Sequence, residues 1–252
     1  MWRADQPMTG NDHRADAANP EQLFDRACAF LRRGDPGANE LLQQLQQYPD
    51  FAQGWLAVGR VLRECDQPEA ALIALKQSLA AAQAPPAAAA EHADLLLETA
   101  GPVTSAAWLA DACQRWPREV RLLYRLGHAQ YLAGELTQAD SALRKTVQLA
   151  PDFAEAWFDI GLIAEDRRQQ AVAAEAFQAA LTAQPTMAEA AFNLGICLQG
   201  TGAMEAALDA YARAFRLRPQ YLNSIAQALT SAPAGRLWID PAALRRALDC
   251  RA

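Results

Sequence analysis

The sequence predicts an all-α solenoid of about six stacked antiparallel helix pairs, followed by a C-terminal capping helix. Three observations predict this fold class. Prolines recur at a fixed interval of 34 residues, small residues recur between them in the same register, and alanine is abundant while glycine is modest. Alanine is the best helix former, and self-similarity at such a period is typical of repeat architectures.

The prolines set the period. Pro117, Pro151, Pro185 and Pro219 are spaced 34 residues apart, and Pro49 lies two periods before Pro117. Because proline cannot donate a hydrogen bond to the helical ladder, each one is expected to follow the end of the second helix of a pair.

Small residues recur in register with the prolines. A glycine late in the first helix is followed by an alanine in the second, in the pairs Gly59 and Ala71, Gly127 and Ala139, Gly161 and Ala173, and Gly195 and Ala207. We expect the glycine to let the second helix approach closely, and the alanine to admit the next pair. Trp157 and Phe177 would fill the wider spaces. Gly134 and Gly202 suit the tight turn between the two helices.

This pattern resembles the tetratricopeptide repeat, which carries tryptophan, leucine-glycine, alanine and proline at these positions. The resemblance implies a right-handed superhelical solenoid over residues 20–232. Its units are expected at about 20–48 (partial), 49–82, 83–116 (degenerate), 117–150, 151–184 and 185–218, with a capping helix at 220–230. Ala93 replaces the expected glycine in the degenerate unit.

The two ends of the chain fall outside the repeat. Residues 1–19 are polar, contain no apolar signal-peptide core and are expected to form a flexible tail. Residues 233–252 form a C-terminal extension, in which Asp240 and Pro241 are the expected N-cap and first residue of a short helix. Trp238 and Ile239 are expected either to fold back on the array or to contact a partner or second copy.

Composition argues against several classes of protein. The net charge of −6 disfavours nucleic-acid binding, which needs a basic face. No stretch approaches the roughly 18 apolar residues of a membrane span, so no membrane insertion is expected. The five cysteines are odd in number and form no CxxC pair. We therefore expect small buried thiols in a reducing cytoplasm, rather than disulfides or a zinc site.

No catalytic motif emerges from the sequence. The glycine-rich stretch 195–202 lacks the lysine of a phosphate-binding loop, and its glycines fall on repeat positions. Glu165 and Asp166 precede two arginines at an expected helix end, where a solvated surface is favoured over an acid–base pair. The histidines at 13, 92 and 128 are too far apart for a local metal motif. No enzymatic activity, metal or cofactor is expected.

The resemblance implies a concave groove lined by the first helix of each pair. Counted from three residues before the Trp157 position, the family exposes positions two, five, six, nine and twelve there. The candidate partner-binding residues are Arg60, Arg63, Arg121, Tyr124, Arg125, His128, Glu155, Phe158, Asp159, Phe192 and Asn193. Tyr124, Phe158 and Phe192 would form an aromatic stripe along the groove, with arginines in the first half of the groove and carboxylates in the second. Pairing of these charges within the chain, and burial of the stripe in the core, are the alternatives.

Two specialised branches of this family are disfavoured. The clamp that grips a C-terminal carboxylate uses five basic and amide residues, of which only Arg121 and Arg125 are matched. The asparagine ladder of arrays attached to sugar transferases is matched by Asn193 alone.

The sequence therefore predicts a non-catalytic cytoplasmic adaptor that holds a peptide or helix of another protein in its concave groove. Two alternatives remain. One is a structural scaffold that assembles from copies of itself. The other is an accessory subunit that presents substrate to a separate transferase.

Overall fold

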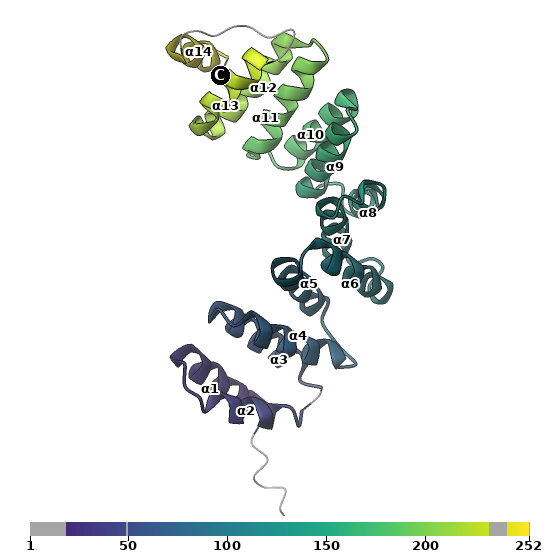
Figure 1. Ribbon diagram of the computed structural model, residues 1–252, viewed down its shortest axis with the longest axis vertical. Helices are drawn as coiled ribbons and strands as arrows, with labels where there is room; N and C mark the ends of the chain where they lie inside the picture. Colours follow the sequence, from purple (N-terminus) through teal and green to yellow (C-terminus); the bar gives the residue numbers. More distant parts are fainter. Residues whose placement is uncertain (1–18, 49, 232–240, 252) are drawn as a thin grey trace, which may run out of the picture. The chain divides into compact units, whose positions relative to one another are not determined.

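The computed structural model describes residues 19–48, 50–231 and 241–251. Within this described part, the regular structure consists of fourteen α-helices and one short 3-10 helix, without a strand (Figure 1). The predicted all-α class is confirmed. Pro49, Trp238, Ile239, Asp240 and the tail up to residue 18 lie outside the described residues.

The chain divides into two compact units. One ends at His92 and the other begins at Ala93, so the division falls inside helix α5 (Pro86–Ala100). The division that the sequence suggests, with an array over 20–232 and an extension over 233–252, remains a prediction.

The first unit is built from helix pairs. Helices α1 and α2 pack together, as do α3 and α4, and α1 also contacts α3. The bounds are α1 (Pro20–Arg33), α2 (Ala38–Leu45), α3 (Ala52–Glu64) and α4 (Pro68–Ala80). The first helix ends at Gly34, whose left-handed backbone closes the turn to the short second helix.

The second unit continues the same arrangement. Each helix from α6 to α12 contacts the next one along the chain, as Figure 1 shows. The bounds are α6 (Pro102–Arg115), α7 (Val120–Leu132), α8 (Leu136–Leu149), α9 (Ala154–Asp166), α10 (Gln170–Ala183), α11 (Ala188–Gly200), α12 (Met204–Leu217), η1 (Pro219–Tyr221), α13 (Leu222–Ser231) and α14 (Pro241–Asp249). We call α3, α5, α7, α9 and α11 the A helices, and the helix after each the B helix.

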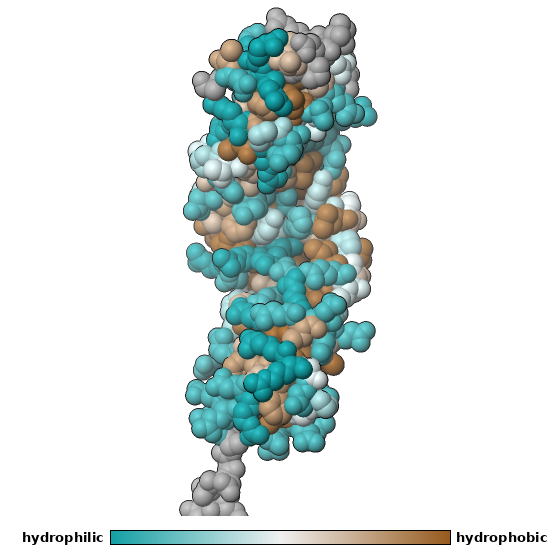
Figure 2. Space-filling view, turned by 90° about the vertical axis from the view of Figure 1, so that its left-hand side faces the viewer, coloured by the Kyte–Doolittle hydropathy of each residue, from teal (hydrophilic) through white to brown (hydrophobic). Residues whose placement is uncertain are grey.

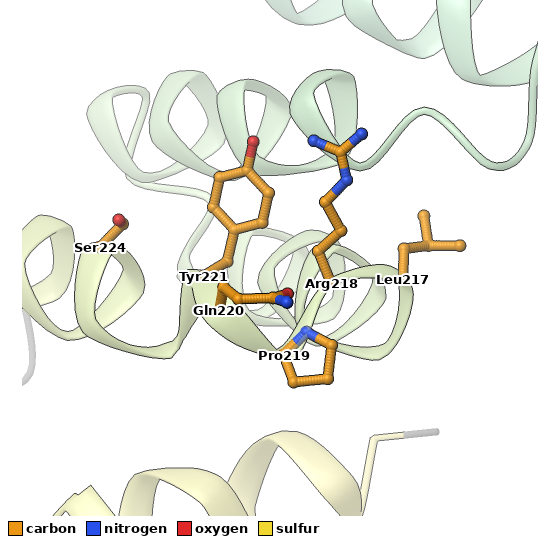
Figure 3. A pocket seen from close by; sticks show the side chains of 6 residues that line it. All are labelled: Leu217, Arg218, Pro219, Gln220, Tyr221 and Ser224. Carbon is orange, nitrogen blue, oxygen red and sulfur yellow. The ribbon is translucent and has the colours of Figure 1, made fainter.

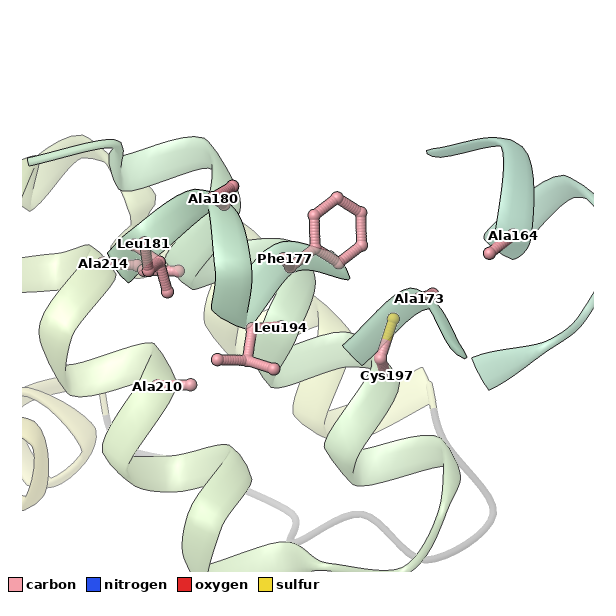
Figure 4. Close-up of a cluster of buried hydrophobic side chains, with 11 residues drawn as sticks. Ala164, Ala173, Phe177, Ala180, Leu181, Leu194, Cys197, Ala210 and Ala214 are labelled. Atoms are coloured by element: carbon pink, nitrogen blue, oxygen red, sulfur yellow. The ribbon is translucent and has the colours of Figure 1, made fainter. Parts of the chain in front are cut away.

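The repeating glycines permit close packing within each pair. A Cβ atom on Gly161 would lie 2.5 Å from the ring of Phe177, and one on Gly195 would lie 2.5 Å from the ring of Tyr211. Both rings are fully buried. The ring of Phe177 lies in the core cluster drawn in Figure 4. The glycines thus serve helix packing, as predicted.

The turn between the A and B helices needs a left-handed residue. Gly134 and Gly202 supply it with φ of 80° and 85°. Asp66 and Arg168 occupy the equivalent positions with φ of 57°, which is unfavourable for residues that carry a Cβ. The sequence identified only the turns that contain glycine.

The C-terminal helices cover the end of the second unit. Ile225 and Leu229 of α13 and Leu244 and Leu248 of α14 are fully buried against α12. After α14, Arg251 forms ion pairs with Glu205 and Asp209, both on α12. The apolar face of α12 is thereby covered.

The five cysteines are all free thiols. Cys28 and Cys197 are buried as expected, whereas Cys250 is exposed and the remaining two are half-buried. The expectation that all five would be buried was therefore wrong, because three fall at the margins of the helix packing. The surface mixes hydrophilic and hydrophobic side chains on the face drawn in Figure 2.

Candidate protein-interaction surface

The predicted partner-binding residues all lie on A helices. Arg60 and Arg63 belong to α3 in the first unit, and the other nine belong to α7, α9 and α11 in the second. In the second unit α7 contacts α9 directly, and each of these helices is also linked to the next through the B helix between them. We call the surface that these helices present the A-helix face.

Ion pairs cross between successive A helices. The Nε and Nη2 atoms of Arg125 donate to the two carboxylate oxygens of Asp94 at 2.7 and 2.8 Å. One helix later, Nδ1 of His128 lies 2.8 Å from Oδ2 of Asp159. In the first unit, Nε of Arg60 donates to Glu91 at 2.7 Å.

These three pairs share one register. The partners are 31 residues apart in every case, which joins position nine of one A helix to position six of the next. Two helices take part in two pairs each, and each of them carries side chains of one charge type at positions six and nine. Helix α5 carries the acidic residues Glu91 and Asp94, and α7 carries the basic residues Arg125 and His128. We call this arrangement the charge ladder.

The charge ladder pairs several charges of the candidate site with one another and shifts the pKa values of side chains beside them. Asp159 is only 3% exposed, so its carboxylate is held by His128 rather than presented to solvent. The hydrogen bond to Asp159 raises the pKa of His128 above its ordinary value. Burial, with the nearby Asp159 and Glu155, raises the pKa of Tyr124.

The ladder stops between α9 and α11. The next rung would join Leu162 to Asn193, and neither can form an ion pair. Asn193 is half-buried and its side chain has no hydrogen bond with another described residue. Two predicted site residues remain exposed without an ion pair or hydrogen bond in the described part of the chain, Arg121 and Glu155. They occupy position two of neighbouring A helices.

The three aromatic residues of the predicted stripe are half-buried and packed against other rings. The Tyr124 ring centroid lies 4.8 Å from that of Phe153, and Phe158 lies 5.5 Å from Phe177. Phe192 stacks on Tyr221 at 5.0 Å. These rings belong partly to the core and expose only the remainder of their surface to a partner.

Comparison with known proteins decides the family. A family model described as tetratricopeptide repeat matches residues 124–188 and 158–221. Residues 124–221 are tetratricopeptide repeats. Gly161, Gly195 and the turn glycines Gly134 and Gly202 therefore lie within tetratricopeptide repeats.

Solved structures share this repeat fold. MamA from Desulfovibrio magneticus RS-1 is 19% identical, with a TM-score of 0.59 over 67% of this chain and 96% of its own. Pseudomonas aeruginosa pilF is 18% identical, with a TM-score of 0.62 over 82% and 97%. YrrB, described as "a TPR protein with an unusual peptide-binding site", is 18% identical, with a TM-score of 0.59 over 73% and 95%. No curated protein sequence matches the chain.

The sequence did not predict a pocket that lies directly after α12. Figure 3 shows an open pocket after α12, of about 570 Å³, lined by Leu217, Arg218, Pro219, Gln220, Tyr221 and Ser224. Arg218 forms an ion pair with Glu189, and Tyr221 stacks on Phe192. Pro219, which ends the repeat, is thus flanked by Arg218 and Tyr221, and both of these residues contact α11 beside the aromatic stripe.

Within the described residues there is neither a cluster of metal ligands nor a helix able to cross a membrane. No group of three or more histidine, cysteine, aspartate or glutamate side chains there could hold a metal ion. Burial raises the pKa of Glu165, and burial and Glu165 together raise that of Cys197 to about 12. None of the helices in the described part is both long and apolar enough to cross a membrane.

Proposed function

We propose that the protein is a non-catalytic adaptor that binds an extended or helical segment of another protein on the A-helix face of its second unit. The fold supports protein interaction in general, because tetratricopeptide repeats present an extended surface of side chains that the packing does not require. The peptide-binding site ascribed to YrrB is consistent with this use of the fold.

One observation carries the finer proposal. Arg121 and Glu155 are exposed and form no ion pair or hydrogen bond with another described residue. They occupy the same position of the successive A helices α7 and α9, which also carry the half-buried Tyr124 and Phe158. A partner segment would place an acidic group near Arg121, a basic group near Glu155 and an apolar side chain against the rings between them. Asn193 would add an amide to this contact. Arg125, His128 and Asp159 frame the groove, and Phe192 extends its apolar part. Arg60 and Arg63 belong to the first unit and are not part of this proposed site.

The test is a charge reversal at Arg121. The Arg121→Glu variant and the unmodified protein are each immobilised and exposed to an extract of the native cells. The proteins that each one captures are then quantified by mass spectrometry. A specific partner should be depleted by roughly tenfold in the variant, and restored by a matching reversal in the partner segment. Equal capture by both would exclude Arg121 from the contact.

Lys145→Glu is the matched control. Lys145 is exposed on the B helix α8 of the same repeat, so its reversal changes the net charge equally without touching the A-helix face.

Sedimentation across a concentration range separates the adaptor from a self-assembling scaffold, since an adaptor stays small. The proposed location is the cytoplasm, in line with five free thiols.

A further inference from the structure

A second groove lies among helices α10, α11 and α12, away from the A-helix positions described above. Its volume is about 300 Å³, at the lower end of the range for ligand sites. It is lined by Gln178, Leu181, Leu194, Leu198, Ala206, Asp209, Ala210, Arg213, Arg216 and Arg251. We call it the α10–α12 groove.

The floor of the α10–α12 groove is apolar. Leu181 and Leu194 are buried in the core cluster, where Figure 4 shows them near Ala210, and Leu198 is half-buried beside it. Helix packing accounts for this floor. The rim is different, because three arginines gather there.

Two of these arginines are fixed by the fold. Nη2 of Arg213 donates to the carbonyl oxygen of Pro185 at 2.9 Å. Arg251 is held by Glu205 at 2.5 Å and by Asp209 at 2.7 Å. Arg216 is exposed and makes no hydrogen bond or ion pair with any residue that the structure describes.

The repeat itself does not require these arginines. The positions of Arg213 and Arg216 in α12 are occupied by Ala179 and Thr182 in α10, the B helix one repeat earlier. Three arginines face two carboxylates here, which leaves one positive charge on a chain whose net charge is −6.

We infer that the α10–α12 groove docks an acidic amphipathic segment of a partner protein. An apolar side chain of that segment rests on the floor at Leu194 and Leu198, and a neighbouring carboxylate pairs with Arg216. Arg213 and Arg251 add positive potential without leaving their own partners. The site is independent of the A-helix face, so one chain can hold two partners at once.

The test uses two labelled peptides and the full chain. The first is a fluorescein-labelled twelve-residue amphipathic helix with leucines at helical spacing and aspartates elsewhere, and the second replaces every aspartate with asparagine. Fluorescence anisotropy should show that the aspartate peptide binds, and that the asparagine peptide binds at least roughly tenfold more weakly. Arg216→Glu should weaken the aspartate peptide by about tenfold.

Two variants serve as controls. Arg121→Glu, on the A-helix face, and Lys145→Glu, on the B helix α8, should both leave the affinity for the aspartate peptide unchanged. Since Arg216 is exposed, its reversal should leave the circular dichroism and the melting temperature unchanged.

Several results would overturn the inference. These are no binding of the aspartate peptide, equal binding of the two peptides, or undiminished binding by Arg216→Glu. Loss of binding in Arg121→Glu instead would move the peptide to the A-helix face, which supports the adaptor proposal while refuting this one. Dissociation of an oligomer by Arg216→Glu without peptide would make the occupant a second copy of the chain.

Discussion

Oδ2 of Asp159 lies 2.8 Å from Nδ1 of His128, and this contact joins α9 to α7 through a carboxylate that is 3% exposed. The hydrogen bond favours the protonated imidazole. A buried carboxylate retains its charge at low cost only when a cation or donor stays beside it, so this pair is where the charge ladder is most sensitive to change.

The pKa values of the two described histidines should be shifted in opposite directions from the ordinary value of an imidazole. The pKa of His128 is raised by Asp159, whereas burial lowers that of His92 to about 4. NMR titration of the imidazole resonances should place His128 above about 6.5 and His92 well below it. Asp159→Asn should lower the pKa of His128, and no change on that substitution would contradict the pairing.

The pH dependence of stability follows from the raised pKa of His128. The folded state binds the proton more tightly than the unfolded state, so this stabilisation is complete below about pH 6.5 and is lost as the pH rises through the folded pKa. Urea unfolding should show this loss in the unmodified chain. His128→Gln should abolish it, and should cost roughly 1–3 kcal/mol at low pH because Asp159 then lacks its cation.

The pair of Arg125 and Asp94 should contribute modestly. Its side chains are 27% and 31% exposed, so a double-mutant cycle with Arg125→Ala and Asp94→Ala should give a coupling of about 1 kcal/mol. The coupling should shrink in high salt because the pair is partly exposed. A coupling indistinguishable from zero at low salt would show that the pair adds register without stability.

Gly161→Ala should destabilise the second unit. The added Cβ would lie 2.5 Å from the Phe177 ring, which is fully buried and cannot swing away. Overpacking of this kind costs about 1–3 kcal/mol, which chemical denaturation can measure. Glu175→Ala, at an exposed site on α10, is the control and should change the free energy of unfolding by less than about 0.5 kcal/mol.

Arg168→Gly should stabilise the protein. Arg168 holds φ of 57° at the turn where Gly134 and Gly202 stand in other repeats. Removing the Cβ relieves about 1 kcal/mol of backbone strain, partly offset by the entropy of an added glycine. Gly134→Ala should do the opposite, although its Cβ would meet no atom within 4 Å. Thermal melts of the two variants should therefore shift in opposite directions.

The fold could be predicted from the sequence because helix packing imposes a fixed period on the residue types. Gly161 and Phe177 must be small and large at a fixed spacing, and Pro185 must follow the helix, so the constraint is local and visible. The turns at Asp66 and Arg168 were missed because their conformation is imposed by the packed helices on either side, against the preference of the residue.

The candidate site could be predicted only in part. The sequence places Arg125 and Asp159 on the A helices, but which charges are paired depends on rotamers and distances across helices. An opposite charge 31 residues away was the available signal, since this spacing joins position nine to position six. The α10–α12 groove had no such signal, because Arg251 arrives from beyond the repeats.

The charge ladder also fixes the order in which the repeats can stand. Helix α7 meets a carboxylate on each side, Asp94 before it and Asp159 after it. Excising residues 120–153 would preserve the 34-residue frame and every small and large position, yet it would bring those two carboxylates face to face. Repeats that look interchangeable by shape are therefore not modular in charge, and recombination within this gene is constrained by polarity as well as by length.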